Sequence, residues 1–357
     1  MMKRLHLPKK WLFLSLNILL CLLALGVWLW GAGVRNALPT LDAAQTWAGE
    51  SGENFAQIAC YLPADAPVEE SAVMQFRQKV NQKLTEASIT APNGGSLFTD
   101  AYCGESSITV QGDKGSASVK ATGVGGDFFR FHPLRLRSGS YLAESDLMKD
   151  RVILDEALAW KLFGGMDLTG MSVTINGESY YVAGVVARED DKYTAAAYSA
   201  DEGGIFVSFD ALKKWDEKAG VTCYEVVLPN PISSFGYNLV KDNFSVGQGV
   251  LVENSSRYSV SNLISVIKSF GKRSMGVNGI IYPYWENAVR LTEDYAALSL
   301  LLTALLLLCP VVSGVIFCIR GIIRLYRRGK TLAVEKTEAL IDRHNEKVWE
   351  KTYGKKE

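Results

Sequence analysis

The chain of 357 residues lacks the motifs of the common nucleotide-dependent enzymes and metal proteins. No G-x-x-x-x-G-K-[ST] run is present, which excludes ATP binding through a P-loop. No C-x-x-C spacing occurs, and His6, His132 and His344 are far apart in sequence, which argues against a zinc or haem site. Ser138-Gly139-Ser140 does not match the G-x-S-x-G turn of a hydrolase. We therefore expect no catalytic residue, no cofactor-binding residue, no metal ligand and no enzymatic activity in this chain.

An excess of charge of either sign is also absent. The chain has 38 basic and 38 acidic residues, so its formal net charge is zero. Nucleic-acid-binding domains usually carry a clear basic excess. We expect no nucleic-acid partner.

Two uncharged apolar runs are present, at residues 11–34 and 295–319. Each exceeds the roughly 20 residues that a helix needs to cross a bilayer. The mixed-polarity segment between them, residues 35–294, is far longer than an ordinary loop. The sequence predicts two transmembrane helices that bracket one large domain.

The charges flanking the two runs predict their orientation. Basic residues precede the first run, no acidic residue occurs before Asp42, and basic residues follow the second run. The flanking residues are Lys3, Arg4, Lys9, Lys10, Arg320, Arg324, Arg327, Arg328 and Lys330. Because Lys and Arg accumulate on the cytoplasmic side of a span, residues 1–10 and 320–357 are predicted to be cytoplasmic. The large domain is then extracellular or periplasmic, and the protein lies in the plasma or inner membrane.

A cleaved signal peptide is the alternative for the first run. Signal peptides have about 7–15 apolar residues followed by a small-x-small cleavage site. The run at residues 11–34 is longer, and residues 33–36 (GVRN) make a poor site. We favour an uncleaved span.

The outer domain begins with a β-α-β-β rhythm that predicts an α+β fold. Strands are expected at residues 56–62, 97–102, 106–111 and 117–123, and a helix is expected at residues 68–84. This order suggests a partly antiparallel sheet covered by helices.

A second block predicts a smaller α/β subdomain. After the strand at residues 151–154, Asp155 is a good helix N-cap, and the helix ends at Gly164-Gly165. Asn176-Gly177 predicts a tight hairpin. We interpret residues 150–220 as an insertion between two parts of one core domain, residues 35–149 and residues 221–294.

The cysteines divide between the spans and the outer domain. Cys21, Cys309 and Cys318 lie in the spans, where they are expected to act as small apolar residues. The outer compartment permits disulfides. Cys60 and Cys103 each lie in a strand-like stretch, so the sequence is compatible with one bridge between them.

The order of several short motifs resembles the extracytoplasmic core domain of MacB/FtsX-type ABC-transporter permeases. These motifs are GGDFFRFHPLRLRSGS at residues 125–140, RVILDEALAWKLFGG at residues 151–165, LTG at residues 168–170, the hairpin at residues 175–177, and VAGVV at residues 182–186. The likeness extends over roughly residues 55–228. It implies a porter-like sheet domain with an inserted subdomain, a separate cytoplasmic ABC ATPase, and a second permease-like subunit or a homodimer. Members of this family typically have three spans after the outer domain and this sequence has one, so it resembles a half-sized permease.

The last segment carries a thin apolar stripe. Val334, Ile341 and Val348 recur every seven residues among charged residues. One interpretation is a helix near the lipid headgroups, assisted by Arg320, Arg324, Arg327 and Arg328. The other interpretation is a docking helix for the ATPase.

Two functions therefore remain open. The first is a permease-like membrane subunit that couples a separate ATPase to movements of the outer domain. The second is a membrane-anchored scaffold or sensor that does not transport and has a permease-derived outer domain. A tethered outer hydrolase would require catalytic residues that the sequence does not provide.

Overall fold

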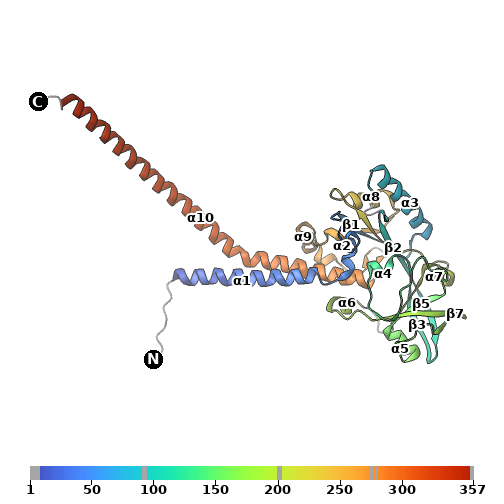
Figure 1. The fold of residues 1–357 in the computed structure, drawn as a ribbon. Helices are drawn as coiled ribbons and strands as arrows, with labels where there is room; N and C mark the ends of the chain where they lie inside the picture. The colour runs from blue at the N-terminus through green and yellow to red at the C-terminus, as the bar shows by residue number, and fades with distance from the viewer. Residues whose placement is uncertain (1–8, 91–94, 199–202, 274–275, 278–279, 354–357) are drawn as a thin grey trace, which may run out of the picture. The chain divides into compact units, whose positions relative to one another are not determined.

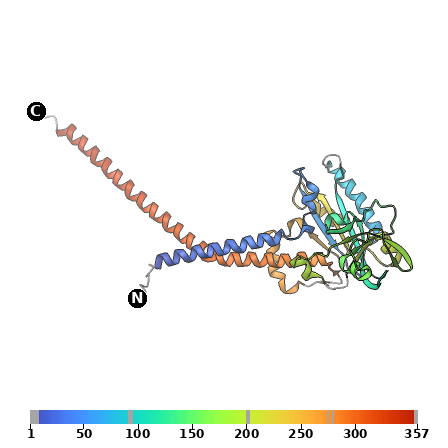
Figure 2. The same ribbon diagram turned by 60° about the horizontal axis from the view of Figure 1, so that its bottom comes forward.

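The computed structural model describes residues 9–90, 95–198, 203–273, 276–277 and 280–353. Its contacts divide the chain into two units. A helical unit contains the residues up to Gly31 and those from Ser299 onward, and a core unit contains Ala32–Leu298. Each unit is described separately below (Figures 1 and 2).

The core unit is built on one mixed sheet, which has ten strands among the described residues. The main strand order is β10-β1-β9-β2-β3-β8-β5-β7-β4, and β6 pairs with both β2 and β7. The strands are β1 (Phe55–Tyr61), β2 (Thr99–Gly112), β3 (Gly115–Gly126), β4 (Leu136–Gly139), β5 (Arg151–Asp155), β6 (Ser172–Ile175), β7 (Glu178–Val186), β8 (Gly204–Ser208), β9 (Cys223–Pro229) and β10 (Val250–Glu253). A separate two-stranded ribbon consists of β11 (Gly276–Val277) and β12 (Ile280–Ile281).

Short helices cover this sheet (Figure 1). The α-helices are α2 (Ala43–Ala48), α3 (Glu70–Glu86), α4 (Phe128–Phe131), α5 (Glu156–Phe163), α6 (Lys192–Ala197), α7 (Phe209–Trp215), α8 (Phe235–Asn243) and α9 (Val260–Ser269). Among the residues that the structure describes, the 3-10 turns are η1 (Pro39–Leu41), η3 (Asn254–Ser256) and η4 (Phe270–Lys272). The predicted α+β class, with a mixed sheet and covering helices, is confirmed.

Strand β1 shows how the sheet separates two apolar layers. Successive side chains of a strand point to opposite faces. Ile58 and Cys60 pack in a cluster with α3 and α8, whereas Ala59 and Tyr61 pack in a cluster with α2, α4 and the first turn of α10. Both faces of this strand are therefore buried, which explains its nearly continuous apolar sequence.

Two strands predicted separately form one long strand. Residues 97–102 and 106–111 belong mainly to β2, which pairs with β3 from Ala101 to Gly112. Gly104 lies in the gap between the two predicted strands. In the fold it is part of β2, and a Cβ there would overlap the carbonyl oxygen of Gly220. Tertiary packing, and not a turn, therefore explains the glycine.

The block at residues 150–220 shares the sheet with its surroundings. Strand β8 pairs in parallel with β3, and β6 pairs with the distal part of β2. The block has its own apolar cluster, to which Ile108, Val110 and Val119 of the β2–β3 hairpin contribute. The distal hairpin therefore completes the core of this block, while the boundaries at residues 150 and 220 remain a prediction.

The local signals in this block are confirmed. The Asp155 side chain accepts a hydrogen bond from the Leu158 amide at 2.7 Å, and Gly164 ends α5 in the left-handed conformation. Asn176 and Gly177 have φ angles of 51° and 81°, as a tight turn between paired strands requires.

The helical unit contains most of α1 (Lys9–Arg35) and the greater part of α10 (Tyr284–Tyr353). Both helices are long and apolar enough to cross a membrane. They meet at small residues: a Cβ at Gly31 would overlap the Ser299 hydroxyl, and Ala24 is buried. Small residues permit the close approach that apolar helices use to associate in a bilayer.

The bridge considered between Cys60 and Cys103 is incompatible with this sheet. All cysteines are free, and β9 lies between β1 and β2. Two strand spacings separate the cysteine backbones by about 10 Å, beyond the reach of a disulfide. The side chains also belong to opposite apolar layers, and Cys103 lies directly opposite Cys223 instead. The sequence located the strands but not their order.

Burial makes Cys60 a test of this arrangement. Burial raises the pKa of the Cys60 thiol from 9.0 to about 12. Because only the thiolate is nucleophilic, we expect Cys60 in the intact protein to resist a maleimide at pH 8 and to react after denaturation. A cysteine introduced at the exposed Ser118 is the control and should react at once. Peptide mass spectrometry measures both, and equal labelling of the native protein at the two sites would contradict the fold.

The same pKa change determines whether the free energy of unfolding rises or falls with pH. Between pH 9 and 12 the unfolded thiol has lost its proton while the folded thiol keeps it, so the unfolded state binds fewer protons. The free energy of unfolding should fall as pH rises, by at most about 1.4 kcal/mol per pH unit from this group. Cys60→Ala should remove that part of the slope.

Candidate functional site

A buried ionic junction joins the sheet domain to the beginning of α10. Arg257, which follows η3, donates from Nη2 to Glu286 Oε1 at 2.5 Å, and its Nε lies 3.4 Å from Glu293 Oε1. The hydroxyl of Tyr61, at the end of β1, donates to Glu286 Oε2 at 2.9 Å. The side chains of Arg257 and Glu286 are each only 3% exposed. Elements far apart in sequence thus hold one helix through desolvated charges.

A second arginine extends this junction toward the apolar run. Arg273, directly after η4, contacts Glu293 Oε2 from Nη2 at 2.6 Å, and its Nε lies 3.0 Å from Asp294 Oδ1. Its Nη2 also lies 3.3 Å from the carbonyl oxygen of Arg290. Glu286 and Glu293 are seven residues apart, so they lie on one side of the helix, two turns from each other.

The charges of the junction depend on one another. Burial alone would lower the pKa of Arg257, but Glu286 and Glu293 raise it well above its usual range. Burial raises the pKa of Glu286, and the Arg257 guanidinium opposes that shift. A buried charge without its partner is strongly destabilising. The junction is therefore stable only when its arginines and carboxylates are together.

A second polar group lies under the first turns of α10. His132 Nε2 lies 2.5 Å from Glu225 Oε2, and its Nδ1 lies 2.9 Å from the Thr40 hydroxyl. The imidazole packs on the Trp285 indole, with 4.4 Å between the ring centroids. No group of His, Cys, Asp and Glu able to hold a metal occurs among the residues that the structure describes. We interpret the His132–Glu225 pair as part of the surface on which the first turns of α10 pack.

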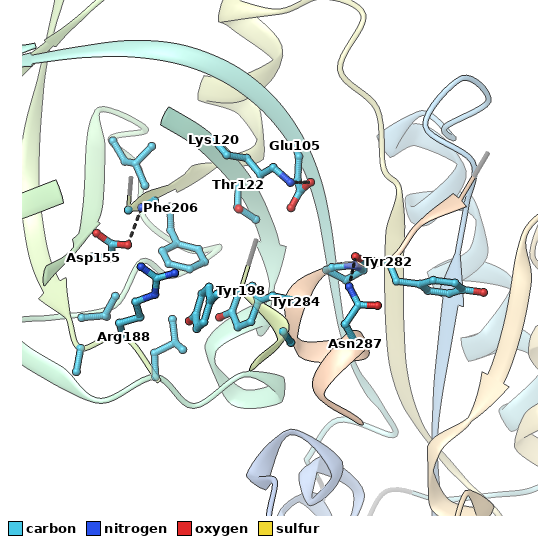
Figure 3. A pocket seen from close by; sticks show the side chains of 18 of the residues that line it. Glu105, Lys120, Thr122, Asp155, Arg188, Tyr198, Phe206, Tyr282, Tyr284 and Asn287 are labelled. Atoms are coloured by element: carbon cyan, nitrogen blue, oxygen red, sulfur yellow. Dashed lines mark hydrogen bonds and ion pairs between the residues drawn. The ribbon is translucent and has the colours of Figure 1, made fainter. Parts of the chain in front are cut away.

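A pocket of about 260 Å³ lies between strands of the sheet and the beginning of α10 (Figure 3). Tyr198 and Tyr284 lie side by side in it, stacked with 4.4 Å between ring centroids, and Arg188 lies over the Tyr198 ring at 4.1 Å. Other walls come from Phe206 and from the ion pair of Lys120 with Glu105. The pocket is thus amphipathic, with aromatic rings and charges of both signs in its walls.

Helix α10 contributes directly to this pocket. Pro283, Tyr284 and Asn287 line it from the helix side, and Asn287 donates to the Tyr282 carbonyl at 3.0 Å. Burial raises the pKa of Tyr198 to about 12, and burial also raises the pKa of Asp155 above its usual value. A molecule in this pocket would touch the first turn of α10.

The structure places the predicted tail residues on one continuous helix. Val334, Ile341 and Val348 are all exposed on α10, and their spacing of seven puts them on the same side. Arg320, Arg324, Arg327 and Arg328 are exposed on the same helix, and their spacings of three and four put them on one side. The role of these residues in docking or headgroup contact remains a prediction.

Comparison with known proteins gives the family of the central segment. Residues 96–234 match the family model described as the MacB-like periplasmic core domain. This segment forms a MacB-like periplasmic core domain. The matched residues run from the beginning of β2 to the loop before α8. The predicted resemblance is confirmed for this segment.

One curated relative and two solved structures extend the comparison. The macrolide export ATP-binding/permease protein MacB of Aggregatibacter actinomycetemcomitans is 28% identical over 109 residues, which cover 30% of this chain and 17% of that protein. The periplasmic region of MacB from Actinobacillus actinomycetemcomitans is 14% identical, with 62% of this chain and 94% of that chain covered and a TM-score of 0.41. The extracellular domain of the noncanonic ABC-type transporter YknZ from Gram-positive bacteria is 16% identical, with 56% and 99% covered and a TM-score of 0.38.

The ionic junction lies outside the matched MacB-like segment. Tyr61 precedes that segment, whereas Arg257, Arg273, Glu286 and Glu293 follow it. Sequence reasoning assigned no role to Glu286, Glu293 or either arginine. Two acids seven residues apart before a transmembrane run were an available signal. Nothing local identified Arg257 as their partner, because η3 meets α10 only in the tertiary fold.

Breaking the junction should destabilise the core unit strongly. Arg257→Met leaves Glu286 buried without its cation, and we expect a loss of about 3–5 kcal/mol in the free energy of unfolding. Denaturant titration of the full chain in detergent, followed by intrinsic fluorescence, measures this loss. The second change in Arg257→Met/Glu286→Leu should restore part of it.

Lys83→Met is the matched control for Arg257→Met. Lys83 and Glu86 form an exposed pair at 2.8 Å, with side chains about half exposed, so the loss should stay below about 1 kcal/mol. Equal effects of the two substitutions would contradict a structural role for the junction.

Proposed function

We propose that this protein is a membrane subunit of a MacB/FtsX-type ABC system, in which a separate cytoplasmic ATPase drives movements of the extracytoplasmic domain. The observation that carries this proposal is the ionic junction on α10. The helix that carries Glu286 and Glu293 continues through the second apolar run to the predicted cytoplasmic tail. The MacB-like core domain supplies the family context.

The junction suits the transmission of a displacement. A helix keeps its length when it is pushed or tilted, because each residue is bonded to the next turn. Buried charge pairs resist sliding, since every partial separation leaves a desolvated charge unpaired. A movement of α10 would therefore carry η3, η4 and the end of β1 with it, as in other rigid-body transitions of packed elements.

The flanking charges support the topology that this function needs. Basic residues at both chain ends favour cytoplasmic termini, which would place the tail within reach of an ATPase. A second permease-like subunit, or a second copy of this chain, would complete the membrane part. The stripe of Val334, Ile341 and Val348 is our candidate ATPase contact.

The tail stripe provides the test of this function. Val334→Ser/Ile341→Ser/Val348→Ser removes the apolar stripe, and Glu335→Ser/Asp342→Ser/Glu350→Ser removes three charges at similar spacing as a control. We expect the ATPase to co-purify in mild detergent with the wild type and the control, and to be lost from the stripe variant by severalfold. Quantitative mass spectrometry of the purified complex measures this. Wild-type protein purified from its own host without any ATPase would contradict the proposal.

A sensor is the second candidate function, and the pocket beside α10 favours it. Its lining joins Arg188 and Tyr198 of the sheet domain to Tyr284 and Asn287 of the helix. A bound amphipathic molecule would change the contacts between these elements, and differential contact is what shifts a conformational equilibrium.

Filling the pocket tests the sensor. Ala197 is a buried residue of α6 that lines the pocket, so the substitution Ala197→Trp should fill it. Ala195 is exposed on the same helix, and Ala195→Trp is the control. Native mass spectrometry of the full chain from host membranes should detect a bound small molecule in the wild type and in Ala195→Trp, with severalfold loss in Ala197→Trp. A wild type that carries no bound mass after incubation with host extracellular extract would contradict the sensor.

A further inference from the structure

The outward side of α9 and η4 combines exposed apolar and basic residues. Val260, Ile264 and Phe270 are 61%, 41% and 63% exposed, and Lys268 and Lys272 are also exposed. We call these five residues the α9–η4 face. Leu263 and Val266 are buried, so the helix is already anchored on its inner side and its outer apolar residues do not serve this core.

Val260, Ile264 and Lys268 lie along one line of the helix. Residues four positions apart are neighbours on a helix surface. The apolar part of this line therefore ends in a lysine, and Lys272 follows four residues later beside Phe270. An exposed apolar strip edged by lysines is typical of helices that lie in the surface of a membrane.

The ionic junction fixes this face beside the outer end of the second apolar run. Arg273 follows η4 directly and contacts Glu293 and Asp294, and the apolar run begins at Tyr295. Phe270 is three residues from Arg273, so the Cα atoms of the two residues lie within about 10 Å of each other. The polar interface of a bilayer is roughly 5–8 Å thick on each side. A residue held at this level beside a membrane span faces the headgroup layer.

We infer that the α9–η4 face lies in the outer headgroup layer of the bilayer and binds anionic lipid. Phe270 and Ile264 enter the boundary between headgroups and acyl chains. Lys268 and Lys272 extend their ammonium groups to lipid phosphates, as long basic side chains do at membrane surfaces. The bilayer is the occupant because Arg273, next to η4, contacts Glu293 and Asp294 just before the second apolar run, and because the lysines of the face are complementary in charge to anionic lipid.

This contact would fix the depth of the outer end of α10 relative to the membrane surface. Arg273 joins the lipid-bound turn η4 to Glu293, so the outer end of the helix is held at a defined depth. The inference requires that the second apolar run crosses a bilayer. It does not require an ATPase, a second subunit or a ligand.

Spin labels in nanodiscs test the depth of this face. The full chain, with Cys21, Cys309 and Cys318 replaced by Ala, carries a label at Phe270→Cys, at Ile264→Cys or at Trp160→Cys. Trp160 on α5 is 62% exposed, which matches Phe270, but α5 packs on the apolar cluster of the block at residues 150–220. In discs of phosphatidylcholine and phosphatidylglycerol, the ratio of oxygen accessibility to nickel-complex accessibility should be severalfold higher at positions 270 and 264 than at position 160. Equal ratios at the three positions would overturn the inference.

Charge reversal tests the lipid chemistry in the same discs. Lys268→Glu/Lys272→Glu should lower the accessibility ratio at position 270 toward the value at position 160. Lys79→Glu/Lys83→Glu, a lysine pair of the same spacing on the exposed side of α3, should leave the ratio unchanged. An unchanged ratio in the first variant would overturn the assignment to anionic lipid, and so would an equal ratio in discs of pure phosphatidylcholine.

Discussion

The attraction between Arg257 and the two carboxylates of α10 is the interaction on which the rest of the arrangement depends. Arg257 and Glu286 are almost completely buried, and Glu293 is shared between Arg257 and Arg273. Charges removed from water must be paired, because an unpaired charge in the interior costs several kcal/mol. This requirement fixes the position of the first turns of α10 along the helix axis, and their rotation about that axis, relative to β1, η3 and η4. The His132–Glu225 pair and the pocket around Tyr284 lie against the same helix.

The MacB-like segment and the junction have separate tasks in this view. The segment at residues 96–234 contains most of the sheet and the whole distal cluster. The residues of the ionic junction lie before and after that segment, whereas His132, Tyr198 and Glu225 contribute to the surroundings of α10 from within it. The family match therefore describes the central part of the sheet, while the ionic junction between the flanking elements and α10 lies outside it.

Much of the local structure followed from the sequence. Asp155 and Gly164 bound helix α5, and Asn176-Gly177 closes the hairpin of β6 and β7, because cap and turn geometries depend on a few neighbouring residues. Sheet order did not follow. The sequence allowed a bridge between Cys60 and Cys103, which β9 separates, and it divided the single strand β2 between residues 102 and 106. Both errors have the same cause, which is that strand neighbours are chosen by contacts between distant segments.

The sequence by itself determined the two apolar helices, the α+β class of the domain between them and the resemblance of its central segment to the MacB core. These features depend on hydrophobic length, periodicity and motif order, all of which are local in the chain. Only the tertiary structure decided that Arg257 and Arg273 meet Glu286, Glu293 and Asp294, and that Tyr198 meets Tyr284. Such pairs form because folding removes both partners from water at the same place, and no spacing in the sequence encodes that place.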